Sequence, residues 1–312
     1  MRCKNQNPQR SGREDKNMGV ELNDPDVIWH YTKMETIQRI FLPVGEKREE
    51  GTITLRYTNI RFLNDPTETK ILKPGLINHK DKLNNMGKIG KILLKDIEEL
   101  DTQGKNFHDI SNKVYSFSAT SIKDSFAFWD TEYAGRKGIS VGFKKNMIKE
   151  EISNDFAFGG PKPILYINSN KIDDKDFETI VAKAASKYNE YNRMKKFLEE
   201  ELHSEADKFE WSFLEYFLGT SSCTCKHISW EHEREWRSLL FIKNDIETTV
   251  FSKNDVKKIY LASIDQKCVD SIILGPECNE DQREAIEDYL KNNGYYDIKV
   301  EISHAFDSIN SI

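Results

Sequence analysis

Two glutamates and an arginine occupy alternate positions where a charged segment runs into an apolar one. Residues 230–241 read WEHEREWRSLLF, and the apolar part after Arg237 has the length and composition of a buried strand. In such a strand Glu233, Glu235 and Arg237 point to one face of the sheet. Close carboxylates repel and an arginine offsets that repulsion, so their pKa values are expected to separate, which suits catalysis. The alternative is an edge strand with a solvated, ion-paired face.

A histidine stands at the end of another predicted strand. Residues 27–31 (VIWHY) are β-prone, and the segment after them has helical spacing. Thr32, with Glu35 three residues later, predicts a capping box for that helix. His30 therefore lies where a strand passes into a helix, a usual position for ligand-binding groups. The alternative is a core histidine that hydrogen-bonds to the backbone.

A serine and aromatic group follows a third predicted strand. Residues 114–118 (VYSFS) form the strand, 124–129 (DSFAFW) a short helix, and 139–143 (ISVGF) the next strand. This unit arranges four side chains around one candidate cleft: Ser118, Ser125, Trp129 and Tyr133. The alternative is that the aromatic side chains belong to the core, as most aromatic residues do.

Further carboxylates raise the question of a metal. Asp65 and Glu68 lie in the polar turn NDPTE, where Asp65 is predicted to cap a helix. With Glu233 and Glu235 they define an alternative, a carboxylate-dependent hydrolase or nuclease that uses a divalent metal. No cluster in the sequence has convincing metal-ligand spacing, and the segment CTCKH at 223–227 is too tight for a usual zinc knuckle. We therefore expect no metal site.

The composition describes a folded protein without a membrane span. The chain has 312 residues, of which 38% are hydrophobic and 31% charged, and its net charge is −6. A generally basic, nucleic-acid-coating protein is excluded, so any nucleic-acid contact must be local. No apolar run approaches the roughly 18 residues of a membrane helix. The five scattered cysteines fit reduced thiols and the N-terminus has no secretory pattern, so we expect a cytoplasmic protein.

Short β-prone runs and few long helices predict an α/β (α+β) fold with a split, mostly antiparallel mixed sheet. Residues 1–26 are expected to form a flexible polar tail, and residues 27–312 a single domain. A helical insert of two helices is predicted at about 172–222, because this region is charged with one apolar side. The other predicted elements are helices at 88–100 and 281–292 and strands at 52–57, 163–167, 256–261, 271–274 and 299–303.

In their order and spacing these motifs resemble a bacterial family of unknown function. The family pattern joins an HYT strand end, an NDPxE turn, an SFS strand with an aromatic helix, a WxxExExR block and a late IILG strand. The matching segments are HYT at 30–32, NDPTE at 64–68, SFS at 116–118, DSFAFW at 124–129, GISVGF at 138–143, Lys226 with WEHEREWR at 230–237, and IILG at 272–275. The resemblance covers roughly residues 27–303 and names no chemistry.

More remotely, the same elements are similar to ADP-ribosyltransferases of the diphtheria-toxin and poly-ADP-ribose polymerase type. The resemblance implies the fold of those enzymes, NAD as the substrate, Glu235 as the catalytic residue and Glu233 as its partner. It also implies that a histidine donates to an NAD ribose and that an aromatic pair holds the nicotinamide. The NAD-binding residues implied are His30, Tyr31, Thr32, Ser118, Ser125, Trp129, Tyr133 and Arg237. The chain departs from the pattern at the stacking position, where Trp129 or Tyr133 replaces a tyrosine at one fixed spacing.

The resemblance also implies a toxin or an anti-phage defence effector. Its partners would be a macromolecular ADP-ribose acceptor, either nucleic acid or protein, and an antitoxin protein. Neither the acceptor nor the choice between transfer and NAD hydrolysis follows from the sequence. A non-catalytic ligand- or partner-binding module, with His30 and Trp129 lining its pocket, is the other alternative. Turnover of NAD separates these hypotheses, and metal dependence separates out the hydrolase.

Overall fold

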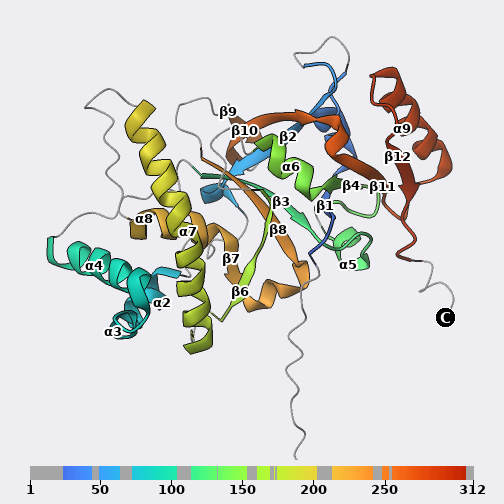
Figure 1. Ribbon diagram of the computed structural model, residues 1–312. Coiled ribbons are helices and arrows are strands. Elements are labelled where there is room, and N and C mark those ends of the chain that lie inside the picture. Colours follow the sequence, from blue (N-terminus) through green and yellow to red (C-terminus); the bar gives the residue numbers. More distant parts are fainter. Residues whose placement is uncertain are drawn as a thin grey trace, which may run out of the picture.

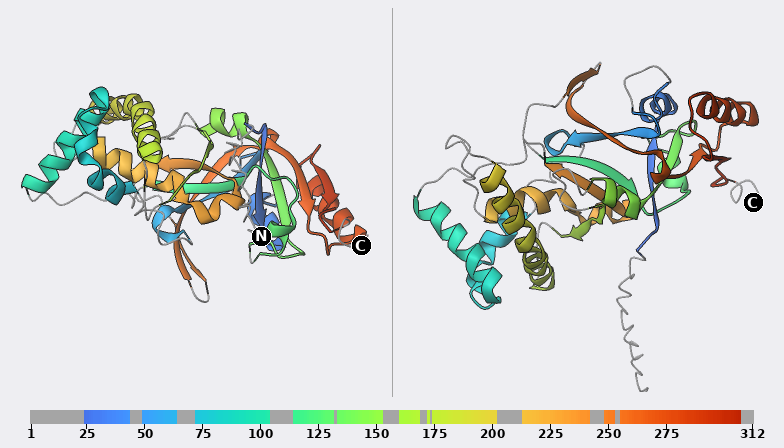
Figure 2. Two further views of the ribbon diagram at one scale, coloured as in Figure 1. Left: turned by 90° about the horizontal axis from the view of Figure 1, so that it is seen from below. Right: turned by 45° about the horizontal axis from the view of Figure 1, so that its top comes forward.

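Strands and helices alternate along the part of the chain that the structure describes (Figures 1 and 2). The structure is a computed structural model that describes residues 24–43, 49–63, 72–103, 114–131, 133–152, 160–168, 172, 174–201, 213–241, 248–252 and 255–306. The strands are β1 (Val27–Thr32), β2 (Thr52–Asn59), β3 (Val114–Thr120), β4 (Ile139–Lys144), β5 (Lys162–Pro163), β6 (Leu165–Ile167), β7 (Cys225–His227), β8 (Glu235–Phe241), β9 (Thr248–Ser252), β10 (Asp255–Asp265), β11 (Val269–Leu274) and β12 (Lys299–Ile302).

The helices divide into α-helices and short 3-10 helices. The α-helices are α1 (Ile37–Ile40), α2 (Leu72–Asn78), α3 (Lys80–Leu83), α4 (Gly87–Gln103), α5 (Phe126–Trp129), α6 (Lys145–Ile152), α7 (Asp174–Glu201), α8 (Phe213–Ser221) and α9 (Glu280–Asn292). The 3-10 helices are Met34–Thr36, Ile60–Phe62, Ser222–Thr224, Ile228–Glu233 and Gln266–Cys268. Helices α7 and α8 fall within the predicted insert.

The main sheet is mixed and mostly antiparallel, as the sequence predicts. Its strand order is β12-β11-β4-β1-β3-β2-β10-β9, while β8 pairs with both β3 and β5 outside that path. Among its described pairs, only β11 with β12 is parallel. Strands β6 and β7 form a separate parallel pair beside it.

The sheet divides at β3. Along one edge β3 pairs with β8 over its whole length, from Val114 to Thr120. Along the other edge it pairs with β2 only at Tyr115 and Ser116, and with β1 only at Thr120. Strands β1 and β2 therefore diverge from a shared neighbour, and the backbone of β3 between Ser116 and Thr120 lies open toward the gap.

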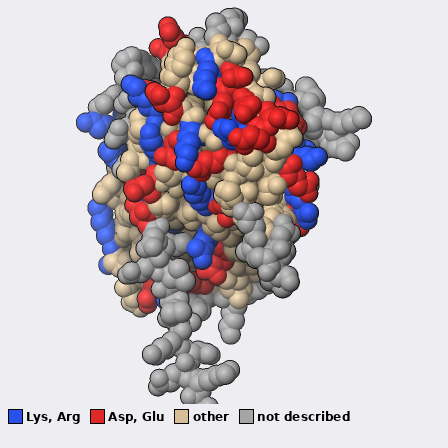
Figure 3. Space-filling model, turned by 90° about the vertical axis from the view of Figure 1, so that its right-hand side faces the viewer, with Lys and Arg blue, Asp and Glu red and all other residues tan. Residues whose placement is uncertain are grey.

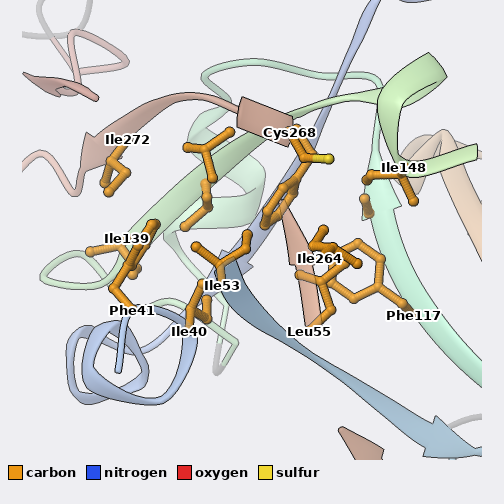
Figure 4. Packing of buried hydrophobic residues seen from close by; sticks show 14 of the residues in the cluster. Ile40, Phe41, Ile53, Leu55, Phe117, Ile139, Ile148, Ile264, Cys268 and Ile272 are labelled. Atoms are coloured by element: carbon orange, nitrogen blue, oxygen red, sulfur yellow. The ribbon is translucent and has the colours of Figure 1, made fainter. Parts of the chain in front are cut away.

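Two large hydrophobic clusters and a smaller one support this sheet. The first lies between the sheet and helices α1, α6 and α9, and Figure 4 shows Ile53 and Leu55 of β2 among its side chains. In β2 the buried residues alternate with half-buried ones, as the sequence TITLRYTN requires for a strand with one face in the core. The second cluster joins α2, α4, α7 and α8 at the other end of the sheet. Figures 1 and 2 show these helices gathered there, away from α9.

The end that carries α9 is rich in acidic side chains. Its sequence EDQREAIEDYLKN has five acidic and two basic residues. Figure 3 views this side and shows Asp and Glu side chains crowded together in one area. This face is unsuited to a polyanionic partner, because like charges repel.

Three predictions about local structure need correction. Thr32 does not cap the following helix: Lys33 stands at the N-cap without a side-chain cap bond, and Thr32 Oγ1 donates to Thr36 Oγ1 at 3.0 Å. The strand predicted at 163–167 is two strands that pair with different partners. Bonding to β8 continues one residue past Pro163, since the Ile164 N–H donates to the Glu235 carbonyl at 2.9 Å. It ends there because the Glu235 N–H donates to the Tyr166 hydroxyl at 2.8 Å instead of to the backbone. The third correction concerns residues 230–234 and belongs to the site below.

Some predictions lie outside the described residues. They are most of the predicted tail, because the description begins at residue 24, and the turn that contains Asp65 and Glu68.

Candidate active site

A cavity of about 240 Å³ lies where β1 and β2 diverge from β3. Its walls include residues of β1, β2, β3 and β8, which the split brings around one space. The segment after β3 adds Phe128 and Tyr133, and the 3-10 helix before β8 adds Trp230 and Glu233. The cavity therefore draws on segments that are distant in the sequence.

Strand register explains why several polar side chains meet there. In the β3–β8 pair, Ser118 lies opposite Arg237 and Thr120 lies opposite Glu235. Residues that are directly opposite in an antiparallel pair point to the same face. Ser116, two residues before Ser118, shares that face and also lines the cavity.

His30 closes part of the gap in the sheet. Its Nδ1 lies 2.8 Å from the carbonyl oxygen of Ser118, in the stretch of β3 that neither β1 nor β2 covers. Its ring packs against Phe117 with a centroid distance of 4.9 Å. Because a carbonyl oxygen only accepts, Nδ1 must carry the proton and donate it to Ser118. The histidine thus satisfies a backbone acceptor that the split leaves unpaired.

The protonation of His30 limits what it can offer a ligand. Burial lowers its pKa below the ordinary value of 6.5, although the bond to Ser118 opposes that shift, so the ring is neutral at pH 7. With the proton on Nδ1, Nε2 of the neutral ring is an acceptor. Nε2 can therefore accept a hydrogen bond, whereas the resemblance implies a histidine that donates one to a ribose.

Glu235 is a buried carboxylate held by two cations. Arg237 donates to it from Nε at 2.5 Å and from Nη2 at 3.0 Å, and Lys226 Nζ lies 2.8 Å from Oε2. Burial opposes the charge of Glu235, but the two cations outweigh it and hold the pKa at about 2. Arg237 also donates from Nη1 to the carbonyl oxygen of Cys223 at 2.6 Å. Glu235 is therefore ionised at any pH near neutrality.

Glu233 shares Lys226 with Glu235 but is less enclosed. Lys226 Nζ donates to Glu233 Oε2 at 2.6 Å, and the Glu233 side chain is 13% exposed against 8% for Glu235. Burial raises the pKa of Glu233 above its ordinary value, although Lys226 opposes the shift. The two pKa values thus move in opposite directions. Glu235 is the deeper of the two, as the sequence predicts.

The segment before Glu235 is not a strand, which corrects the prediction for residues 230–241. Ile228–Glu233 is a 3-10 helix, and Arg234 has a left-handed backbone with φ of 42°. The turn is fastened to the end of β3, because Thr120 Oγ1 donates to the Glu233 carbonyl at 2.7 Å. Glu233 therefore reaches the cavity from a turn, not by strand alternation. Of the alternative, an edge strand with a solvated, ion-paired face, the solvated face is wrong, because Glu235 and Arg237 are buried. The ion pair between these two residues is present.

Trp129 does not line the cavity, contrary to prediction. It is fully buried, and its Nε1 donates to Asp124 Oδ1 at 2.6 Å. Its neighbour Phe128 lines the cavity instead and stacks on Tyr31 at 4.8 Å. Tyr133 also lines the cavity and is 40% exposed. Of the two residues considered for the stacking position, Tyr133 is thus the one that a ligand can reach.

The remaining predicted residues hold the walls in place. Tyr31 lines the cavity, and its hydroxyl donates to the carbonyl of Lys123 at 3.0 Å and accepts from the Ser125 N–H at 3.2 Å. Ser125 is the N-cap of α5 and lies outside the cavity wall, as does Thr32 at the end of β1. Ser125, Thr32 and Trp129 are therefore not brought into the site.

Sequence reasoning missed residues that line the cavity. Ser116 is 3% exposed, and its hydroxyl is buried without a hydrogen-bond partner. The period of two from Ser118 could have identified it. Lys226 appeared only as part of a family pattern, since nothing in its local sequence shows that it bridges two carboxylates. Arg56 of β2 and Lys257 of β10 also line the cavity, and no pattern in the sequence indicates this.

No group of three or more His, Cys, Asp or Glu side chains arranged to hold a metal is found among the described residues. Cys223 and Cys225 are buried, and neither forms a disulfide with another described residue. None of the helices that the structure describes is long and apolar enough to cross a membrane.

Comparison with known proteins identifies one family. Residues 129–238 match the family described as a protein of unknown function (DUF2971). The predicted resemblance to a family of unknown function is thereby confirmed. The matched region runs through β4, the helical insert and the segment with Glu233, Glu235 and Arg237, and it begins after His30. No curated protein and no solved structure matches the chain.

Proposed function

With residues 129–238 matching a family whose description gives no chemistry, the cavity itself is the basis for a function. We propose that the protein is an NAD-dependent ADP-ribosyltransferase that works at this cavity. One observation carries the proposal: His30, Ser118 and the Glu233–Glu235 pair come from three distant segments and line the same space. A pair of carboxylates in one cavity is a feature of sites that cleave glycosidic bonds.

The reaction breaks the bond between the ribose C1′ and the nicotinamide nitrogen. The bonding electron pair leaves with nicotinamide, and positive charge develops on the ribose as in glycoside hydrolysis. The acceptor oxygen or nitrogen then bonds to C1′ and releases its proton to a base. A carboxylate near the ribose stabilises this positive charge, which would be unfavourable in an apolar site that lacks a negative group.

Glu235 is suited to the electrostatic part of this reaction. A carboxylate has about four lone-pair positions, and three donor atoms of Arg237 and Lys226 occupy three of them. One position remains on Oε1, where it can accept a hydrogen bond from the ribose 2′-hydroxyl. The low pKa of Glu235 keeps the negative charge in place throughout.

Glu233 is the better candidate for the base. Its pKa is raised by burial, and only Oε2 is bonded to Lys226 among its contacts within the described residues. A carboxylate with a raised pKa takes a proton more readily than Glu235 does. Glu233 therefore receives the proton of the acceptor, and His30 Nε2 accepts a hydrogen bond from a second ribose hydroxyl.

The size and walls of the cavity fit one end of NAD. Its volume of about 240 Å³ lies below the ~300–1,000 Å³ of sites that enclose a drug-sized ligand. The nicotinamide riboside end would occupy the cavity against Phe128 and Tyr133, whose rings offer stacking surfaces. The unpartnered hydroxyl of Ser116 would gain a hydrogen bond from the ligand. The adenylate would extend toward the mouth.

Incubation of the purified protein with NAD tests the proposal. Two labelled forms, one in nicotinamide and one in the adenylate, are used with and without cell extract. Release of nicotinamide with adenylate label on nucleic acid or protein means transfer, and release without transfer means hydrolysis. Glu233→Gln should reduce transfer more than NAD cleavage. Glu178→Gln, on an exposed position of α7, is the matched control and should behave as the parent. If NAD is neither cleaved nor bound, the proposal fails.

One observation favours a second candidate, a non-catalytic binding module. Both carboxylates are already paired with Lys226, and Glu235 also with Arg237, which reduces the field they exert on a ribose cation. In that case NAD or a related ligand would bind without turnover. Calorimetric binding of NAD together with complete stability of the nicotinamide label would select this candidate.

A further inference from the structure

A second cavity lies beside β8, between α7 and the β5–β8 pair. Its volume is about 290 Å³, and three of its lining residues are Lys162 of β5 and Lys183 and Lys187 of α7. Lys183 and Lys187 are four residues apart, so they project from the same side of the helix. Lys162 lies opposite Arg237 in the strand ladder and reaches the cavity from the sheet.

The ammonium group of Lys183 differs from its two neighbours in its partners. Lys187 Nζ and Lys162 Nζ share the carboxylate of Glu190, at 2.6 and 2.9 Å. Lys183 Nζ donates to the carbonyl of Thr224 at 3.1 Å and lies 3.8 Å from Cys225 Sγ. Within the described part of the chain Lys183 has no carboxylate partner, so its positive charge is not balanced by an ion pair there.

Burial makes this imbalance costly. The Lys187 side chain is 4% exposed. Its pKa falls to about 8, because burial opposes the charged form and the Lys162 and Lys183 ammonium groups add to that opposition, against the attraction of Glu190. An anion placed among the three ammonium groups would relieve the repulsion. A bound anion would therefore account for this cluster of three lysine ammonium groups.

We propose that this cavity, defined by Lys162, Lys183 and Lys187, is a binding site for a phosphoryl group. Three ammonium groups around one space, with Lys183 lacking a carboxylate partner among the described residues, suit a phosphate or a phosphate monoester, which is largely a dianion near neutral pH. Lysine ammonium groups bind phosphate as compact point charges and donate up to three hydrogen bonds each. The site is separate from the proposed NAD chemistry, although Arg237 lines both cavities.

Titration calorimetry at pH 7.5 in 0.15 M NaCl tests this inference with two probes. Inorganic phosphate represents a free ion, and methyl phosphate represents a monoester such as a metabolite carries. Both probes should bind the parent. Tighter binding of methyl phosphate would identify a monoester as the natural ligand, and tighter binding of inorganic phosphate would identify the free ion.

Lys183→Gln removes the unpaired charge and should weaken binding of the better probe about ten- to a hundredfold, the worth of one charge-assisted hydrogen bond. Lys175→Gln is the matched control, because Lys175 is an exposed residue of the same helix outside the cavity. Its binding should equal that of the parent. Thermal melting without phosphate checks that each variant is folded.

A second variant keeps the test decisive if Lys183→Gln does not fold. Lys162 is 43% exposed on its side chain and comes from β5, so Lys162→Gln should fold and should also weaken binding at least about fivefold. The inference is overturned if neither probe binds the parent up to millimolar concentration. It is equally overturned if the folded lysine variants and Lys175→Gln bind the probe alike, since binding is then not at this cavity.

Discussion

The Glu235–Arg237 pair should dominate the response of the protein to mutation at this site. Arg237 is 2% exposed and Glu235 is 7% exposed, so removal of either charge leaves the other buried without its partner. Breaking a buried pair in this way costs about 3–5 kcal/mol. We expect Glu235→Gln and Arg237→Met each to lower the free energy of unfolding by that amount. The double variant should lose less free energy of unfolding than the two single variants together, because neither charge of the pair then remains buried without the other.

The pKa of Glu235 gives an independent measure of the same interaction. A fall from 4.5 to about 2 corresponds to about 3 kcal/mol of differential stabilisation of the ionised form. Because the folded-state pKa is lowered, this stability is present above the unfolded pKa of about 4.5. It is lost as the pH falls toward 2. The difference in the free energy of unfolding between the parent and Glu235→Gln should therefore be constant from pH 7 to 5 and should decrease below pH 5.

Urea unfolding followed by tryptophan fluorescence measures both effects. The four proteins of the double-mutant cycle are compared at pH 7, and the parent and Glu235→Gln are then compared down to pH 2. A coupling energy below about 0.5 kcal/mol would show that Glu235 and Arg237 do not stabilise each other. The same would follow if the difference in the free energy of unfolding between the parent and Glu235→Gln did not change down to pH 2. The cycle also serves the functional test, because activity of Glu235→Gln is interpretable only at temperatures where it is folded. There, transfer should fall at least about 100-fold.

Three other residues allow sharp tests. Burial lowers the pKa of His30 in the folded protein, so below pH 6.5 the unfolded chain takes up a proton while the folded ring stays neutral, and the parent loses stability. His30→Gln lacks this titration, so its free energy of unfolding should fall less between pH 7 and 5 than that of the parent. Urea unfolding at the two pH values measures the difference. Asp124→Asn should lower the free energy of unfolding by about 1–2 kcal/mol in the same assay. Asp124 Oδ2 accepts a hydrogen bond from the His304 N–H, and the amide NH₂ that replaces Oδ2 cannot accept it. Ser116→Ala should leave stability unchanged or slightly higher, because it removes an unpartnered hydroxyl, and should weaken NAD binding about three- to tenfold by calorimetry.

The fold could be read from the sequence where one face of an element is buried. The alternation in TITLRYTN predicts β2, and the structure buries Ile53, Leu55 and Tyr57 as that pattern requires. Helices α4, α7 and α9 follow from helical spacing in the same way. The prediction of one strand at 163–167 failed because its two halves pair with different neighbours, β8 and β7, which come from distant segments. Local patterns do not carry this information.

The candidate site was predictable only in part for the same reason. Glu235, Arg237 and Ser118 follow from strand alternation, which tertiary structure does not change. Trp129 was misplaced because its half-buried partner, Asp124, also accepts bonds from Ser303 and His304, which are distant in the sequence. Glu233 reaches the cavity through the left-handed turn at Arg234, and arginine carries no sequence preference for that conformation.

The divergence of β1 and β2 from β3 has a consequence for biosynthesis. The gap is closed by His30 and Ser118, which are 88 residues apart, and its far wall is β8, which ends at Phe241. A ribosome releases the chain from its N-terminus at about 5–20 residues per second. The cavity therefore stays incomplete until β8 and Lys257 have emerged, and long-range pairings of this kind form slowly. Translation products that stop before β8 would lack Glu235 and the Arg237 guanidinium that holds it, so activity would require chains that extend past β8.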